Sequence, residues 1–150
     1  SNSFERHVSK YKVGVKEGIY YIADVARTRS DPHGVELLVA QCAALDGPGV
    51  AVRMEREPGS SGLGVIDHYS RLVLSGYDFL GLPSTGSKEL RANPLSSAAA
   101  SGNVRLVNGY WVTAFLDELE AFPMGSHDDQ VDAASGAFSD LRSSFALSFA

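Results

Sequence analysis

The chain begins with a segment in which polar and apolar residues alternate. Tyr11–Val15 alternates, Lys16-Glu17-Gly18 is a turn sequence, and Ile19–Val25 is rich in β-branched and aromatic residues. Two such segments around a short glycine-containing turn are typical of a β-hairpin. We therefore expect two antiparallel strands at the start.

The next pattern has the spacing of an amphipathic helix. Asp31-Pro32 places an N-cap residue before a proline at the first helical position, and Gly47-Pro48 ends the pattern. Between them, apolar residues recur at helical intervals: Val35, Leu38, Val39, Cys42 and Leu45. These signals predict one helix that closes at Gly47.

Strands and helices alternate through the rest of the chain. Strands are predicted at Val50–Met54 (ending at Pro58-Gly59), Asp78–Leu82 and Asn103–Val107. Helices are predicted at Gly64–Ser75, in part of Lys88–Ala100 where Pro94 interrupts, at Trp111–Phe122, where Asp117, Glu118 and Glu120 fall off the apolar stripe, and at Val131–Leu141. This order predicts an α/β fold with an antiparallel hairpin joined to parallel strands and helices on both sheet faces.

The composition is that of one ordinary globular domain. The chain has 150 residues, 44% hydrophobic and 21% charged. No apolar run approaches the roughly 20 residues that span a membrane, and the start carries no secretory signal. Ser1-Asn2-Ser3 resembles a cloning remnant. These features predict a protein that is neither secreted nor in a membrane.

Cysteine content and net charge exclude some functions. Cys42 is the only cysteine, which excludes an internal disulfide and a zinc site built from cysteines. Its place in an apolar helical pattern favours a buried structural thiol in a reducing compartment. The net charge of −5 argues against a sequence-independent DNA coat, which would be strongly basic. It does not argue against a nuclease, because acids at a metal site lower the net charge.

One pair of acids ends a predicted core strand. In Met54-Glu55-Arg56-Glu57, alternation along a strand places Glu55 and Glu57 on the same side if the strand persists. Sites in α/β sheets gather at this carboxyl edge. The alternative is a solvated strand end with Arg56 as the counter-charge. Spacing alone leaves both interpretations open.

A second acidic cluster opens the last predicted helix. In His127-Asp128-Asp129-Gln130-Val131-Asp132, helical geometry places Asp128 one turn from Asp132, with Asp129 within reach. These like charges need compensation, either from the helix dipole or from a hard cation such as Mg²⁺ or Mn²⁺. His127 is either a supporting group or proton shuttle for the acids, or a surface residue before the helix.

Two further segments could contact phosphate groups. Thr85-Gly86-Ser87-Lys88 lacks the spacing of a nucleotide-binding loop, which excludes ATP binding there. Lys88 and Arg91 are candidates for DNA phosphate contacts or are solvated cations at a helix start. Ser60 and Ser61, between Gly59 and Gly62, form either a flexible turn or a set of amides that face a phosphate. No hydrolase triad is evident.

Taken together, the motifs resemble a known family. The ordered set comprises Tyr20–Arg27, Asp46-Gly47, Glu55–Gly62, Lys88 with Arg91-Ala92, Gly109-Tyr110-Trp111, Phe122-Pro123 and His127–Ala133. From about Tyr11 to Leu141, the chain resembles the C-terminal nuclease domain of tailed-phage terminase large subunits.

The resemblance implies an RNase H-like mixed sheet and a divalent-metal endonuclease that cuts concatemeric double-stranded DNA during viral packaging. It implies a two-ion site of Mg²⁺ or Mn²⁺, with one acid at Glu57 (Glu55 is the competing choice) and others at Asp128, Asp129 and Asp132. It also implies an ATPase domain, a small terminase subunit and a portal as partners, in the cytoplasm of a bacterial host.

One element of the family pattern has no counterpart. The family carries an aspartate on a first strand ahead of the hairpin, but Glu5 is the only acid before Tyr11, and Asp24 is a poor substitute. We expect either a late start of the chain or a missing segment, no ATPase half, and weak cleavage by these 150 residues alone. The alternative functions are a catalytically incomplete RNase H-like interaction module and another RNase H-like nuclease, such as a junction resolvase or an integrase core.

Overall fold

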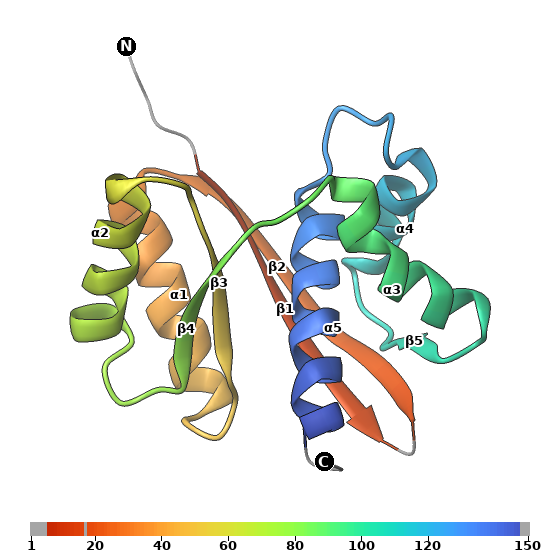
Figure 1. Cartoon of the computed structure of the whole chain (residues 1–150), viewed down its shortest axis with the longest axis horizontal. Coiled ribbons are helices and arrows are strands. Elements are labelled where there is room, and N and C mark those ends of the chain that lie inside the picture. The colour runs from red at the N-terminus through yellow and green to blue at the C-terminus, as the bar shows by residue number, and fades with distance from the viewer. Residues whose placement is uncertain (1–5, 17, 148–150) are drawn as a thin grey trace. The chain divides into compact units, whose positions relative to one another are not determined.

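The computed structural model of the chain describes residues 6–16 and 18–147 (Figure 1). Its contacts divide the chain into two compact units. The first unit comprises Thr28–Thr85 together with the start of the chain, and the second comprises Val8–Arg27 and the chain from Gly86 onward. Each unit has its own sheet and its own hydrophobic core.

The first unit begins with the helix that the capping signals predict. Helix α1 spans Pro32–Asp46, and the Asp31 side chain accepts a hydrogen bond of 2.8 Å from the Gly34 amide. At the other end, Gly47 adopts a positive φ of 86°. That conformation suits glycine and ends the helix. Both predicted ends of this helix are therefore confirmed.

Two parallel strands form the sheet of the first unit. Strand β3 (Val52–Arg56) pairs with β4 (Phe79–Pro83), so that Val52 lies opposite Phe79 and Met54 opposite Gly81. Side chains of this face contribute to a core cluster around three buried residues, Ala43, Tyr69 and Leu74. The ends of both strands lie within about two residues of their predicted positions, so both predictions are confirmed.

The helix between these strands differs from the prediction. Helix α2 spans Ser60–His68, four residues ahead of the predicted start at Gly64, and continues as a π-helical turn, η1, at Tyr69–Val73. The helix starts early because Gly59 serves as its N-cap. The π-helical turn includes the buried ring of Tyr69, which belongs to the core cluster of the first unit.

The second unit contains the hairpin and a third strand. Its sheet has the order β1-β2-β5, with β1 at Arg6–Lys16, β2 at Ile19–Ser30 and β5 at Val104–Leu106. Strands β1 and β2 are neighbours joined across residues 17 and 18, a connection that suits only antiparallel strands. Strand β5 pairs with β2 in parallel, and Ile22 lies opposite Leu106. The predicted combination of a hairpin with a parallel strand is confirmed, although Lys16 belongs to β1 and not to the turn.

Three helices complete the second unit: α3 (Lys88–Ala100), α4 (Val112–Ala121) and α5 (Asp129–Leu147). Its core cluster is formed by buried residues of β2, α3, α4 and α5 and by Trp111, which directly precedes α4. The seven residues are Ile22, Val25, Leu95, Trp111, Phe115, Ala134 and Phe138. The Trp111 and Phe115 rings meet edge to face, with their centroids 5.9 Å apart. The apolar stripe predicted at Trp111–Phe122 therefore faces the core.

The predicted interruption at Pro94 is wrong. Helix α3 runs without a break from Lys88 to Ala100, with Pro94 inside it. A proline removes one backbone hydrogen bond and crowds the preceding turn. Ala92 and Leu95, on either side of it, are buried in the second unit. Their packing holds the helix together across the proline.

The architecture agrees with the predicted fold class, a mixed α/β structure with parallel and hairpin strands. The parallel pairings are divided between two sheets, one in each unit. The sequence analysis predicted one domain with helices on both faces of a single sheet. Such a sheet would have to span the two units, so this part of the expectation stays a prediction. In the part of the chain that the structure describes, no helix has the length and apolarity needed to cross a membrane.

Candidate functional site: the acidic start of the last helix

Three aspartates mark the start of α5. Asp128 directly precedes the helix, and Asp129 and Asp132 lie in its first turn. The Asp132 amide donates a hydrogen bond of 2.9 Å to the Asp128 carbonyl, which places these two residues one helical turn apart. His127 is exposed and lies directly before them. The spacing predicted for the cluster is therefore present.

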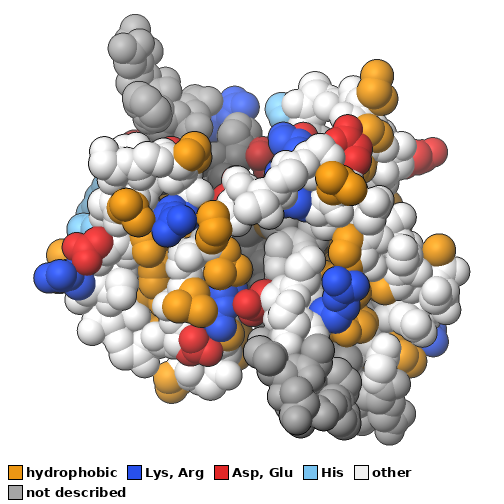
Figure 2. Space-filling view, viewed as in Figure 1, with side chains coloured by type: hydrophobic (Ala, Val, Ile, Leu, Met, Phe, Trp, Pro, Cys, Tyr) orange, Lys and Arg blue, Asp and Glu red, His pale blue; other side chains and the backbone are white. Residues whose placement is uncertain are grey.

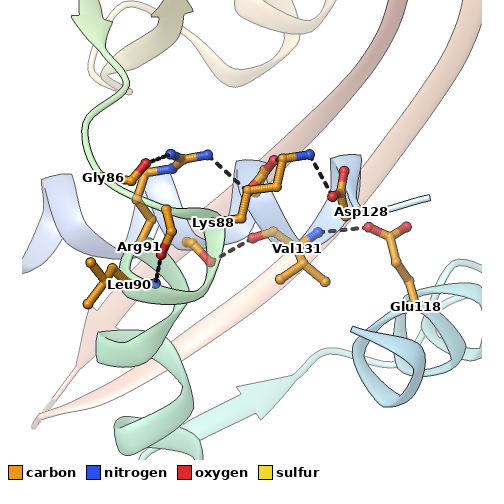
Figure 3. Close-up of polar contacts among 10 residues, drawn as sticks. Gly86, Lys88, Leu90, Arg91, Glu118, Asp128 and Val131 are labelled. Carbon is orange, nitrogen blue, oxygen red and sulfur yellow. Dashed lines mark hydrogen bonds and ion pairs between the residues drawn. The ribbon is translucent and has the colours of Figure 1, made fainter. Parts of the chain in front are cut away.

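The charges of this cluster are compensated by cations from α3 (Figure 3). Lys88 Nζ donates to Asp128 Oδ2 at 2.6 Å and lies 3.6 Å from Asp132 Oδ2. Arg91 Nη2 lies 3.6 Å from Asp132 Oδ1. Two carboxylates thus converge on one ammonium group, at the positive end of a helix dipole that also favours negative charge.

The Lys88 ammonium is held in its charged form by this arrangement. Its hydrogen bond with Asp128 raises the Lys88 pKa above the usual value, the charges of both aspartates add to the effect, and partial burial opposes it. The shift strengthens the preference for the charged form, which lysine already has at neutral pH. The ammonium acts as a built-in cation between the two carboxylates.

The start of α3 positions these cations. The Ser87 side chain accepts a hydrogen bond of 3.2 Å from the Leu90 amide and so caps the helix. Arg91 Nη1 donates to the Gly86 carbonyl at 2.8 Å, where Gly86 has a positive φ of 73°. The segment that contains both predicted DNA contacts is therefore an ordered helix start, and both cations face acids of the same unit.

The acidic cluster is supported by a buried carboxylate, that of Glu118. The sequence pattern had wrongly predicted this side chain to lie off the buried face of its helix. Glu118 of α4 is only 7% exposed, although the pattern placed it off the apolar stripe. Its Oε1 accepts from the Val131 amide at 2.9 Å (Figure 3). Its Oε2 accepts from Gln130 Nε2 at 2.6 Å. A glutamate from another helix thus satisfies an amide at the start of α5.

The spacing of Glu118 carried a signal that could have identified it. Trp111, Phe115 and Glu118 follow one another at intervals of four and three residues, so they lie on one helix face. A charged residue on an apolar stripe indicates a buried polar contact, because an unpaired charge is too costly to bury. Gln130 carried no comparable signal.

The remaining candidate residues lie in the first unit. Strand β3 ends at Arg56, so Glu55 is within the strand and Glu57 follows it. Alternation along the strand therefore does not extend to Glu57, and the shared orientation of the two glutamates does not follow from it. Both side chains are exposed, as are those of Ser60 and Ser61 in the first turn of α2.

Close backbone packing fixes the segment around Glu57. A Cβ atom built at Gly62 would lie 1.8 Å from the Glu57 carbonyl oxygen, well inside any real contact. Gly62 is buried, and only the absence of a side chain lets the first turn of α2 approach the end of β3. Glu57 is thus held directly against the helix that carries Ser60 and Ser61.

Replacing Gly62 with alanine is expected to lower the free energy of unfolding by about 2 kcal/mol, because overpacking against a backbone atom forces the helix away from the strand. Urea denaturation followed by circular dichroism measures the change. Gly64→Ala is the matched control on the same helix, since a Cβ there meets no atom within 4 Å. That substitution should stabilise the helix by up to about 1 kcal/mol. Equal effects of the two substitutions would contradict the close approach.

Comparison with known families identifies the chain. The family model described as the terminase RNaseH-like domain matches residues 7–141. The chain belongs to this family. The match covers the proposed metal ligands Glu55, Glu57, Asp128, Asp129 and Asp132, and it agrees with the resemblance seen in the ordered motifs. Comparison with curated proteins gives no significant match.

The donor set of the terminase domain suits a hard divalent cation. Carboxylate oxygens are the ligands that Mg²⁺ and Mn²⁺ prefer, and the Asp128 and Asp132 carboxylates already converge on one cation. Within residues 6–16 and 18–147, no group of three or more His, Cys, Asp or Glu side chains is close enough to hold a metal ion. Glu57 belongs to the first unit and Asp129 to the second, so their predicted convergence stays a prediction.

Proposed function

We propose that this terminase domain is a divalent-metal-dependent endonuclease that cuts double-stranded DNA during packaging. The observation that carries the proposal is the convergence of the Asp128 and Asp132 carboxylates on the Lys88 ammonium. Two acids that share one cation in this way are suited to share a metal ion in its place. Membership of the terminase RNaseH-like family supports the same chemistry.

The proposed metal ligands are Asp128, Asp129 and Asp132, with Glu57 or Glu55 completing the site. Bound by these carboxylates, Mg²⁺ or Mn²⁺ would activate water and stabilise the leaving oxygen of a phosphodiester. Glu118 holds the first turn of α5 in place through the Val131 amide. His127, directly before Asp128, is proposed to support the acids or to carry a proton.

Lys88 has two partners in this proposal. In the structure it neutralises Asp128. With Asp128 neutralised by a divalent cation, the Lys88 ammonium would be free to bind a DNA phosphate as a point charge. Arg91 stays tethered to the Gly86 carbonyl and contributes a second cation. Ser60 and Ser61 are proposed to offer backbone amides of the α2 start to a phosphate.

The surface charge is consistent with local rather than global DNA attraction. On the face shown in Figure 2, basic and acidic side chains are interspersed over both units and form no continuous basic surface. The net charge of −5 agrees with this. DNA is therefore expected to bind mainly where a metal ion and a few cations meet it. The remaining proposed partners are an ATPase domain, a small terminase subunit and a portal, in the cytoplasm of a bacterial host.

Mn²⁺ is expected to raise the melting temperature by about 3–5 °C at saturation, because it binds the folded state preferentially. Asp129→Asn and Asp132→Asn should each remove most of this shift, as each removes a charged oxygen ligand. Differential scanning fluorimetry over a Mn²⁺ series measures the effect. Mg²⁺ should act in the same direction.

Two control variants define the site. Asp117→Asn alters an exposed acid of α4 and should leave the Mn²⁺ shift intact. Lys88→Gln should enlarge the shift, because the metal no longer competes with the ammonium at Asp128, while it weakens DNA binding. Metal shifts that are equal in the parent, Asp129→Asn and Asp132→Asn would contradict a metal site here. That result would favour the alternative of a catalytically incomplete interaction module.

A further inference from the structure

The second unit contains a hollow apart from the acidic cluster. It has a volume of about 200 Å³ and is lined by residues of β2, the segment before α4, α4 and α5: Val25, Arg27, Tyr110, Trp111, Ala114 and Gln130. Pockets for drug-sized molecules measure about 300–1,000 Å³. A hollow of this size suits one ring-sized group of a larger ligand.

The lining combines an apolar interior with an exposed aromatic ring and a cation. Val25 is 1% and Trp111 5% exposed. Tyr110, next to Trp111 in the chain, is 90% exposed, and Arg27 is exposed as well. Both side chains line the hollow and are accessible to a ligand that enters it.

A polar group in the lining lacks a hydrogen-bond partner. Gln130 is 1% exposed, and its Oε1 is buried with no partner in the part of the chain that the structure describes. The Nε2 atom of the same amide donates to Glu118 at 2.6 Å. That bond fixes which end of the amide is the acceptor, because a carboxylate cannot donate. Because buried acceptors are normally hydrogen-bonded, we expect a ligand to bring an N–H or O–H group to Gln130 Oε1.

We propose that this hollow binds one unpaired nucleobase of a DNA strand. The base stacks on Tyr110 and donates an N–H group to Gln130 Oε1, and Arg27 binds the adjoining phosphate. The combination of an exposed aromatic ring with a nearby cation is the usual means of holding single-stranded nucleic acid. The proposal deepens the proposed function, on which its choice of DNA as ligand rests, and adds a base-binding position outside the metal site.

The three features favour a nucleobase over a peptide side chain. A peptide would use the hydrogen-bond acceptor and the apolar interior, but only a peptide with a carboxylate at the right position would use the cation. A nucleotide uses all three, since its base is planar, carries N–H donors and is joined to a negative phosphate. The test therefore separates the contribution of the base from that of the phosphate.

Binding is measured through the fluorescence of Trp111, because Trp111 is the only tryptophan in the sequence and lines the hollow. Its fluorescence is followed while short single strands of cytosine nucleotides are added in the presence of EDTA. Cytosine is chosen for its exocyclic amino group. An abasic strand of the same length and charge is the control for phosphate binding. We expect saturable quenching by the cytosine strand and about tenfold weaker binding of the abasic strand.

Exposed positions provide variants that leave the core intact. Tyr110→Ala should weaken cytosine-strand binding about tenfold through loss of stacking, and Arg27→Gln should weaken the binding of both strands. Met124→Ala and Arg105→Gln, at exposed sites outside the hollow, are the matched controls and should bind as the parent does. Gln130→Met removes the acceptor, and because Gln130 also supports Glu118, its result is used only if its melting temperature matches that of the parent.

The outcomes separate this proposal from the metal site. Equal binding of the cytosine and abasic strands, or parental binding by Tyr110→Ala, would overturn it. Because the titration contains EDTA, base binding is measured independently of Mn²⁺ binding at Asp128 and Asp132. Base binding without metal binding, and metal binding without base binding, are therefore distinct outcomes. Loss of both would remove DNA as the ligand of this domain.

Discussion

Replacing Glu118 with alanine is expected to lower the free energy of unfolding by about 3 kcal/mol, since each hydrogen bond to a buried charged group contributes about 1.5–3 kcal/mol and Glu118 makes two. The Val131 amide and Gln130 Nε2 would lose their acceptor in a site where little water can replace it. The start of α5 should fray as a result. Urea denaturation measures the stability, and hydrogen exchange at Val131 reports on the helix start.

Glu120→Ala is the matched control for this prediction. Glu120 lies on the same helix but is exposed, so its loss should change the stability by less than about 0.5 kcal/mol. The Glu118→Ala variant should also lose Mn²⁺ binding, although Glu118 is not a proposed ligand, because the aspartates of the first turn depend on it for their positions. A variant as stable as the parent would show that the buried carboxylate is dispensable.

Replacing Asp132 with asparagine is expected to lower Mn²⁺-dependent cleavage of supercoiled plasmid by about 100-fold or more, because a misplaced metal ion costs large factors in rate. Asparagine keeps the size of the side chain but removes the charge that faces Lys88 and Arg91. Nicking and linearisation are followed on agarose gels over a Mn²⁺ series.

The same assay includes the Asp117→Asn variant as a control. Asp117 is an exposed acid of α4, so this variant should cleave at the parental rate. Melting curves establish that each variant is folded before its rate is compared. Cleavage by Asp132→Asn at the parental rate would contradict the proposed set of acids.

Local signals in the sequence determined most of the secondary structure. Asp31-Pro32 and Gly47 predicted both ends of α1 because capping depends on residues within one turn of the helix end. The apolar stripe of α4 and the strands β3 and β4 were predicted for the same reason, since side-chain periodicity follows from backbone geometry. The ordered motifs also identified the family, and the match over residues 7–141 confirms it.

Predictions that depended on how a helix packs were less successful than those that depended on its local pattern. Pro94 was expected to interrupt α3, and burial of Ala92 and Leu95 overrides its local effect. The prediction for α2 missed its first turn, which Gly62 permits by close contact with the Glu57 backbone. In both cases the deciding contact lies outside the local pattern from which the prediction was made.

For the candidate site, the sequence alone determined the spacing of Asp128 and Asp132, and the tertiary structure decided what compensates their charges. The spacing of Asp128 and Asp132 follows from one helix turn, so it could be read directly. Their cation comes from Lys88, 40 residues earlier in the chain, and the support for α5 comes from Glu118 on a different helix. Electrostatic and hydrogen-bond partners act through space, so they become known only when folding has brought their helices together.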